Sequence, residues 1–394
     1  MKSVSRLHLV GYFVFITLGI NVALLGPSLQ TLSLRTGAAI PELGYIFAAM
    51  SVGYLASAPV IGSLKSNASL RPLLSATGLI LVSLLLFVGA TSLWQALFAA
   101  FLLGFGQAST QVGFITLIGT SLSTERNASG QLNRINAFYG VGALVGPLLV
   151  AVSYRWLGNA LPAFWVAIVL DAVMLVVGLL MPLPRTAATS ADSSVAEKGK
   201  SDLALLRVPA MIALMSMMAV YVGTEVSFSS WATEYTRLGA KVDVAAASLA
   251  SSTFFCGLAL SRYFATLLLA RTTPLRALLF MLMVAAVGVG VMLLPGGFLP
   301  AMLLGAALVG VGYGPVYPTL VSTAIARFPH AARSVSSMVT SAGSIGAITM
   351  PALTGIIIAQ PAGLSIAWGG QLAMIGVMLV LLLGMRRTLL AAAE

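Results

Sequence analysis

The feature that most constrains this chain is a series of twelve apolar segments, each about 20 residues or longer, joined by short polar connections. Only 8% of the 394 residues are charged, whereas soluble domains carry roughly 25%. The chain cannot cover itself with polar surface, so we expect a lipid bilayer to solvate most of it. This excludes a soluble enzyme, a secreted binding module and a disordered scaffold.

The expected spans all have the length of a membrane-crossing helix, because a backbone in lipid must satisfy its hydrogen bonds internally. Their approximate limits are residues 8–32, 42–63, 72–90, 94–122, 130–155, 160–183, 205–232, 243–270, 275–294, 298–327, 332–360 and 363–387. The sequence thus predicts an all-α membrane protein. The only long polar interval, residues 185–204, predicts a cytoplasmic linker between an N-terminal half, 1–184, and a C-terminal half, 205–394.

Three short motifs recur in the two halves at nearly constant spacing. Gly142–Pro147 matches Gly346–Pro351, and Gly53–Ser57 matches Gly257–Ser261, both 204 residues apart. A third match, Gly104-Phe-Gly106 with Gly310-Val-Gly312, is 206 residues apart. Matches in register between corresponding spans predict two six-helix halves in parallel orientation.

Most of the 21 Lys and Arg residues fall on the side of the membrane that holds the N-terminus, which predicts that both termini are cytoplasmic. We expect a multi-pass protein of the cytoplasmic membrane, and a monomer. The net charge of +11 is scattered rather than gathered in a patch, so nucleic acid is not an expected partner. No metal-ligand spacing, phosphate-binding loop or nucleophile–base set is evident, so we expect no metal, no cofactor and no enzymatic activity.

Several segments carry family-like patterns. The loop Gly62–Arg71 stands where a G-x-L-x-D-R-x-G-R-R motif would be, but it lacks the Asp and the central Gly. Other patterns are Phe138–Pro147, Gly310–Pro318, and Tyr221–Glu225 followed by Trp231 and Tyr235.

On these residues the chain resembles the major facilitator superfamily, and within it is similar to the fucose-permease-like sugar transporters, the fucose–galactose–glucose:proton symporters. The resemblance implies twelve transmembrane helices, with spans one, four, seven and ten lining the pathway. It also implies that the acidic residues of spans one and four are replaced by Asn21 and Gln107. The Gly142–Pro147 segment overlaps the G-x-x-x-G-P motif of drug:proton antiporters as well, which keeps that class as the alternative.

Three ionisable residues lie well inside predicted spans, where a charge is costly and needs a reason. Glu225, in span seven, is the candidate for substrate binding and proton coupling. Arg262 in span eight is expected to snorkel or to hold an inner gate, and Asp171 in span six to make an interhelical contact. The repeat relates Asn21 to Glu225. Further structural or gating candidates are Gly62, Arg71, Gly146 and Pro147.

Sugar binding requires side chains that hydrogen-bond hydroxyl groups and aromatic rings that cover C–H surfaces. The amide candidates are Asn21, Gln30, Gln107, Gln111 and Asn136, and the aromatic candidates are Tyr139, Trp231, Tyr313 and Tyr317. Tyr and Trp near span ends also serve as interfacial anchors, so we expect only about half of this set to touch substrate.

These observations predict a secondary transporter that moves a monosaccharide by alternating access, either coupled to protons through Glu225 or facilitative. The alternative is a drug or small-molecule:proton antiporter that exports its substrate. A membrane receptor or scaffold without transport activity is a third possibility, which the short loops disfavour.

Overall fold

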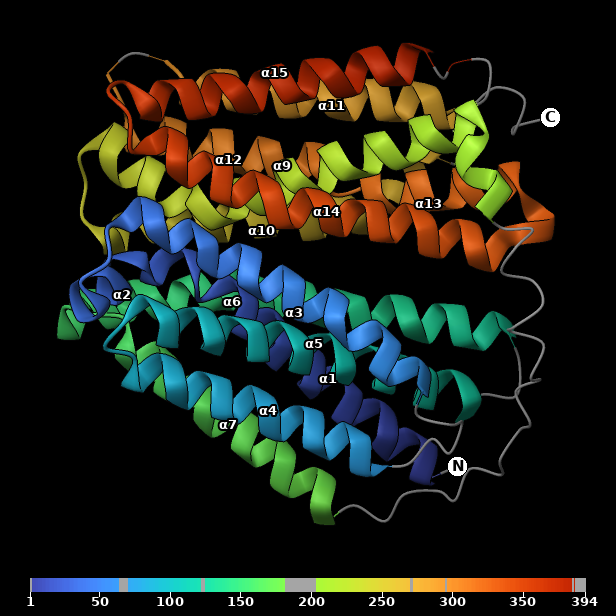
Figure 1. The fold of residues 1–394 in the computed structure, drawn as a ribbon, viewed down its shortest axis with the longest axis horizontal. Coiled ribbons are helices and arrows are strands. Elements are labelled where there is room, and N and C mark those ends of the chain that lie inside the picture. Colours follow the sequence, from blue (N-terminus) through green and yellow to red (C-terminus); the bar gives the residue numbers. More distant parts are fainter. Residues whose placement is uncertain are drawn as a thin grey trace. The chain divides into compact units, whose positions relative to one another are not determined.

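The structure is a computed structural model that describes residues 2–63, 70–121, 125–180, 203–269, 272–294, 296–384 and 386. Helices occupy nearly all of this part of the chain (Figure 1). The chain divides into two compact units. The first contains α1 to α7 and the short segment Asp243–Ser252, and the second contains α9, the rest of α10, and α11 to α15.

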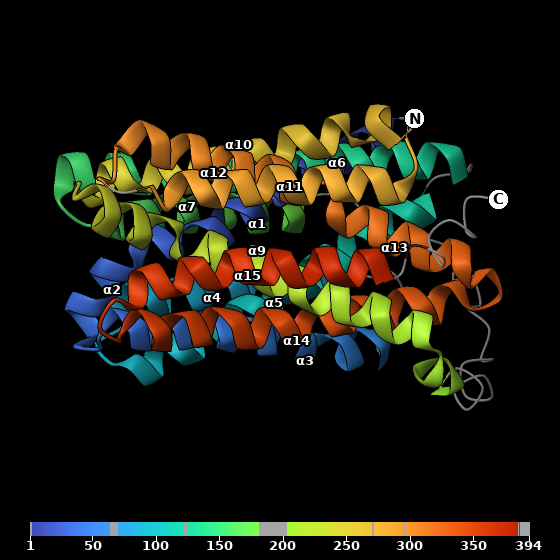
Figure 2. The ribbon, with the colours of Figure 1, turned by 90° about the horizontal axis from the view of Figure 1, so that it is seen from above.

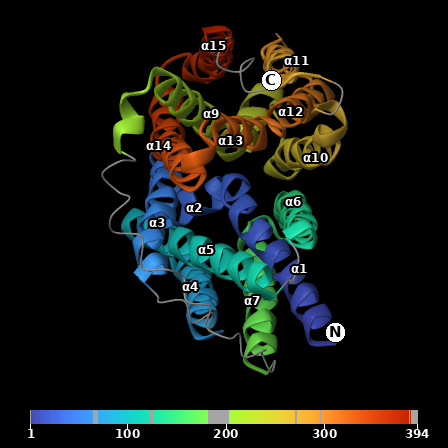
Figure 3. The same ribbon diagram turned by 90° about the vertical axis from the view of Figure 1, so that its right-hand side faces the viewer.

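The helices of the first unit are α1 (Lys2–Ala23), α2 (Leu29–Thr36), α3 (Gly44–Ser63), α4 (Leu70–Gly89), α5 (Leu93–Ser121), α6 (Glu125–Leu157) and α7 (Leu161–Leu180). Two 3-10 turns, η1 (Gly26–Ser28) and η2 (Ile40–Leu43), flank α2. In the end-on view, α5 lies beside α4, and α7 lies beside both α1 and α4 (Figure 3).

The helices that follow are α9 (Pro209–Ala240), α10 (Val244–Leu269), α11 (Pro274–Met292), α12 (Leu299–Tyr313), α13 (Val316–Arg327), α14 (Ala332–Ile358) and α15 (Gly363–Gly384). The 3-10 turns η3 (Leu203–Arg207) and η4 (Pro329–Ala331) precede α9 and α14. In the second unit α9 packs against α14, and α11 against α12 (Figure 2).

Each predicted span coincides with one helix or one broken pair of helices. Among the described residues, nine helices are long and apolar enough to cross a membrane, and the bent pair α1–α2 makes ten. The predicted spans 42–63 and 72–90 coincide with α3 and α4. Within α4, the part Ser75–Gly89 is apolar but shorter than the nine spanning helices. The predicted all-α membrane fold is therefore confirmed. Most of the predicted linker lies outside the described residues.

Two of the predicted spans are broken. Span one bends by 41° between α1 and α2, where Gly26 and Pro27 form η1. Span ten is interrupted between α12 and α13, at Gly314 and Pro315. Proline cannot donate a backbone hydrogen bond to the carbonyl four residues earlier, which explains why both breaks fall at proline.

Glycines bring helices into backbone contact, and the same contacts recur in the two units. A Cβ atom on Gly142 of α6 would overlap the carbonyl of Ile16 on α1. A Cβ atom on Gly346 of α14, 204 residues later, would overlap the carbonyl of Ala219 on α9. Gly19 on α1 likewise faces α6, as Gly223 on α9 faces α14. The sequence repeat is thus a repeat of helix crossings.

The second crossing follows the same rule. In the first unit, Gly53 of α3 and Gly104 of α5 each have no room for a side chain because the other helix's backbone lies against them. Gly257 of α10 and Gly310 of α12 occupy the equivalent places in the second unit. Helices in lipid gain little from hydrophobic burial against one another, so close packing at small residues has to hold them together.

We predict that Gly142→Ala lowers the melting temperature of the purified protein in detergent, because the new methyl group meets the backbone of α1. Overpacking of this kind typically costs about 1–3 kcal/mol. The matched control is Gly78→Ala in α4, where a Cβ atom would meet nothing within 4 Å. Equal melting temperatures for the two variants would contradict the assigned role of Gly142.

Candidate functional site

The break between α12 and α13 exposes backbone carbonyls that need partners. The last regular bond of α12 runs from the Gly314 N–H to the Gly310 carbonyl at 3.0 Å, and the first of α13 from the Thr319 N–H to the Pro315 carbonyl at 3.1 Å. Pro318 has no N–H to donate to the Gly314 carbonyl four residues earlier. An unpaired buried carbonyl is costly, so side chains must take the place of the missing donors.

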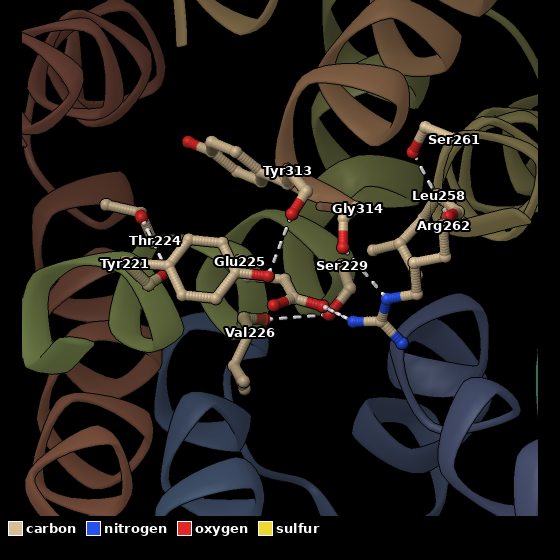
Figure 4. Close-up of polar contacts among 10 residues, drawn as sticks. All are labelled: Tyr221, Thr224, Glu225, Val226, Ser229, Leu258, Ser261, Arg262, Tyr313 and Gly314. Atoms are coloured by element: carbon tan, nitrogen blue, oxygen red, sulfur yellow. Dashed lines mark hydrogen bonds and ion pairs between the residues drawn. The ribbon is translucent and has the colours of Figure 1, made fainter. Parts of the chain in front are cut away.

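Two side chains from other helices supply these donors. The Tyr221 hydroxyl of α9 donates to the Tyr313 carbonyl at 3.0 Å, and Nε of Arg262 of α10 donates to the Gly314 carbonyl at 3.1 Å (Figure 4). Only glycine fits at 314, because a Cβ atom there would overlap the Ser261 hydroxyl. The sequence Tyr-Gly-Pro at 313–315 therefore creates the break and brings α9 and α10 to it.

Glu225 joins this arrangement through Arg262. It lies one helical turn after Tyr221 on α9, so both side chains point to the same face (Figure 4). Its Oε1 is 3.4 Å from Nη2 of Arg262, and the two side chains are 18% and 41% exposed. One guanidinium group therefore touches both the carboxylate and the carbonyl at the break.

Tyr221 and Tyr313 are both fully buried, and their rings meet edge to face at 5.8 Å between centroids. The Tyr313 hydroxyl has no hydrogen-bond partner among the described residues. Trp231, further along α9, is fully buried and donates its ring N–H to the Pro351 carbonyl of α14 at 3.0 Å. Both Tyr313 and Trp231 thus lie inside the second unit rather than at its surface.

A second predicted pair lies in the first unit. Asn21 of α1 is 0% exposed and donates through Nδ2 to the Asp171 carboxyl of α7 at 2.7 Å; Asp171 is 1% exposed. Gln107 of α5, also buried, donates to the Leu18 carbonyl of α1 at 3.1 Å. Asn21 and Gln107 are therefore both used in helix-to-helix contacts.

The remaining candidates are more accessible. The Tyr54 hydroxyl of α3 donates to Oε1 of Gln111 on α5 at 2.8 Å, and Tyr317 of α13 shares a 3.1 Å hydrogen bond with Thr340 of α14. The other partly or fully exposed candidates are Gln30 on α2, and Asn136 and Tyr139 on α6.

The structural candidates are distributed among several helices. Gly146 of α6 packs against Ile20 and Ala23 of α1, and Pro147 is accommodated inside α6 without ending it. Gly62 falls in α3 and Arg71 in α4, and the side chain of Arg71 lies outside the described residues. Within the described residues, no group of three or more His, Cys, Asp or Glu could hold a metal ion.

Three features of these helices were not predicted from the sequence. Glu234 was placed beyond span seven, whereas α9 continues to Ala240 and buries Glu234 beside Arg237, 2.7 Å away on the same helix. The carbonyl of Gly314 is a second feature, and Pro318 four residues later was the signal for it. Tyr54 is the third; no sequence pattern pairs it with Gln111.

An all-helical chain with repeated, glycine-packed units and ionisable side chains buried among membrane-spanning helices has the architecture of a secondary transporter. Residues 11–351 match the Major Facilitator Superfamily, and the chain belongs to this family. It is therefore a multi-pass membrane transporter of a small-molecule substrate and not an enzyme.

Solved structures of several transporters share the fold. The nucleoside transporter NupG is 13% identical, with a TM-score of 0.78 over 98% of this chain and 99% of NupG. A bacterial homologue of the human lysosomal transporter Spinster is 13% identical, with a TM-score of 0.76 over 99% and 98% of the two chains. No curated protein sequence matches the chain.

The E. coli fucose:proton symporter FucP is 16% identical, with a TM-score of 0.62 over 96% of this chain and 98% of FucP. Similarity at this level of identity shows the fold alone. The predicted superfamily is confirmed, but the fold does not favour the fucose-permease-like group over the other transporters.

We predict that Tyr221→Phe destabilises the protein by about 1–3 kcal/mol, the usual cost of leaving a buried carbonyl without its donor. The variant removes only the hydroxyl that reaches the Tyr313 carbonyl. Tyr45→Phe, at an exposed position of α3, is the matched control. Thermal melting in detergent measures both, and an unchanged Tyr221→Phe melting temperature would contradict the capping role.

Proposed function

We propose that this transporter moves a monosaccharide across the cytoplasmic membrane and couples the movement to protons through Glu225. The observation that carries the coupling is the contact of one guanidinium, that of Arg262, with both the Glu225 carboxylate and the Gly314 carbonyl. A change of charge on Glu225 can thereby be transmitted to a break in a membrane span.

The coupling step follows from electrostatics. When Glu225 is ionised, its charge attracts Arg262 and keeps the guanidinium beside the Gly314 carbonyl. When Glu225 takes up a proton, the ion pair becomes an ordinary hydrogen bond, which is weaker. Arg262 then exchanges partners more readily, and the junction of α12 and α13 becomes freer to change its angle. Proline breaks are sites where helices bend.

The neutral polar side chains support an uncharged, hydroxyl-bearing substrate. The Tyr54–Gln111 and Tyr317–Thr340 pairs are accessible enough for a substrate to insert its own hydroxyl groups between them. Exchanging one hydrogen bond for another costs little free energy. Gln30, Asn136 and Tyr139 offer further groups of the same chemistry. The proposal does not require Asn21, Gln107, Trp231 or Tyr313 to touch substrate, because all four are buried.

The proposal also includes the orientation of the chain in the membrane and its division into two halves. The excess of Lys and Arg on one side of the spans supports cytoplasmic termini, and the repeat supports two halves, residues 1–184 and 205–394, joined by a linker. These assignments are tested by labelling single cysteines placed at each end of the chain in a Cys256→Ser background. Labelling of either terminus by an impermeant reagent from outside intact cells would overturn the orientation.

The substrate class is tested by counterflow in proteoliposomes. Vesicles loaded with an unlabelled hexose should transiently accumulate the same hexose in radiolabelled form, without any ion gradient. Gln111→Ala should raise the half-saturating hexose concentration severalfold, whereas Gln95→Ala, on an exposed turn at the start of α5, should not. Exchange of nucleosides or of lipophilic drugs, with no exchange of any hexose, would replace the monosaccharide by that class.

The role of Glu225 is tested separately by Glu225→Gln. We predict that this variant still performs counterflow but loses hexose accumulation driven by an inward proton gradient, because glutamine cannot take up a proton. Glu234→Gln is the matched control on the same helix, since Glu234 pairs with Arg237 three residues later in α9 rather than with Arg262 at the break. Proton-driven accumulation at the wild-type level in Glu225→Gln would disprove the coupling role.

A further inference from the structure

The Asp171 carboxyl of α7 is deeply buried and has no cationic neighbour among the described residues. Its side-chain partners are Asn21 and Thr17, both on α1. It makes no ion pair with any described residue. An ionised carboxylate so far from water is strongly destabilised unless a positive charge or several donors compensate it. The Asn21 amide supplies one donor, which is little compensation for a full charge.

The helices that pack against α7 bring few other ionisable groups. These helices are α1, α4 and α6. Where their side chains are described, their titratable or charged residues are Tyr12, Tyr139, Tyr154 and Arg155. None of these is among the groups that act on Asp171. The electrostatic environment of Asp171 is therefore set by burial, Asn21 and Thr17.

The two partners offer acceptors as well as the one donor. The Oδ1 atom of Asn21 is buried and has no hydrogen-bond partner among the described residues. The Thr17 hydroxyl donates its single proton to the Val14 carbonyl at 2.9 Å, and while that bond is made its oxygen is available only as an acceptor. An ionised carboxylate has nothing to donate to either oxygen. A neutral carboxylic acid carries an O–H that can donate to one of them while its other oxygen still accepts from Asn21.

We infer that Asp171 is a proton-binding site of the first unit: it carries a proton in this structure, as a neutral acid hydrogen-bonded to Asn21 and Thr17. The site is separate from Glu225, which lies in the second unit and has Arg262 as its counter-charge. It is also independent of the proposed substrate. At its place in the repeat the two units differ, because Asn21 corresponds to Glu225 and the acid of the first unit comes from α7 instead.

Infrared spectroscopy of the purified protein tests this directly. The chain contains four aspartates, so labelling the aspartate carboxyl carbon with ¹³C separates their bands from those of glutamate. At pH 5 we expect a labelled band of a protonated carboxylic acid that is lost in Asp171→Asn. Asp243→Asn, at an exposed cap of α10, should keep the band. Absence of the band in the wild type, or its persistence in Asp171→Asn, would overturn the inference.

A second variant protects the test against misfolding of Asp171→Asn. Asn21→Leu retains the acid but removes the amide donor, so the same carbonyl-stretch band should move to higher frequency. A band at unchanged frequency would show that the acid does not pair with Asn21 and would overturn the assignment. Neither measurement needs substrate, so both can succeed even where the hexose or Glu225 experiments fail.

The pH dependence of stability gives an independent readout. If Asp171 is protonated in the folded protein and ionised in the unfolded chain, folding takes up a proton, and stability falls as pH rises. We expect the melting temperature of the wild type, measured relative to Asp171→Asn, to fall between about pH 4 and about pH 6. A constant difference between the two proteins over that interval would contradict the inference.

Discussion

Backbone contact at glycines is the interaction on which the rest of this structure depends. Helices in a bilayer are surrounded by lipid as apolar as their own side chains, so burial against a neighbouring helix gains little. Gly19 and Gly142 instead let the backbones of α1 and α6 meet, and Gly53 and Gly104 do the same for α3 and α5. The polar side chains of each unit are brought within hydrogen-bonding distance because these crossings are so close.

The close crossings also determine where polar groups can be buried. In the second unit, the break at Gly314 and Pro315 leaves carbonyls that Tyr221 and Arg262 reach from neighbouring helices, and Arg262 brings Glu225 with it. In the first unit, α7 packs on α1 so that Asp171 faces an amide and a hydroxyl rather than a cation. The two units thus share their helix crossings. The acid of the second unit, Glu225, has a cationic partner, whereas the acid of the first unit, Asp171, has an amide partner.

Much of the fold could be predicted from the sequence, because membrane-spanning segments must be long, apolar and helical. The sequence located the spans and the superfamily, and the glycine repeat identified residues that the structure places at helix crossings. It did not predict which side chains donate to the carbonyls at the break in span ten, where Pro318 removes the backbone donor for Gly314. The end of span seven was also placed too early, because the polar residues Glu234 and Arg237 pair within α9.

The candidate site was less predictable, since residue type does not tell whether a side chain faces another helix or an accessible surface. Asn21, Gln107 and Gln111 are all amides in membrane helices, yet the first two are buried in helix contacts and the third is partly accessible. The ionisable candidates were easier to find. Asp171, Glu225 and Arg262 stand out in the sequence because charges inside a membrane are costly.

By itself the sequence determined that the chain is a helical membrane protein with repeated halves, because apolar length and glycine spacing are properties of the chain alone. Only the tertiary structure decided that Glu225 has a counter-charge and that Asp171 has none among the described residues. The physical reason is that the free energy of a buried charge depends on which groups the helix packing places beside it.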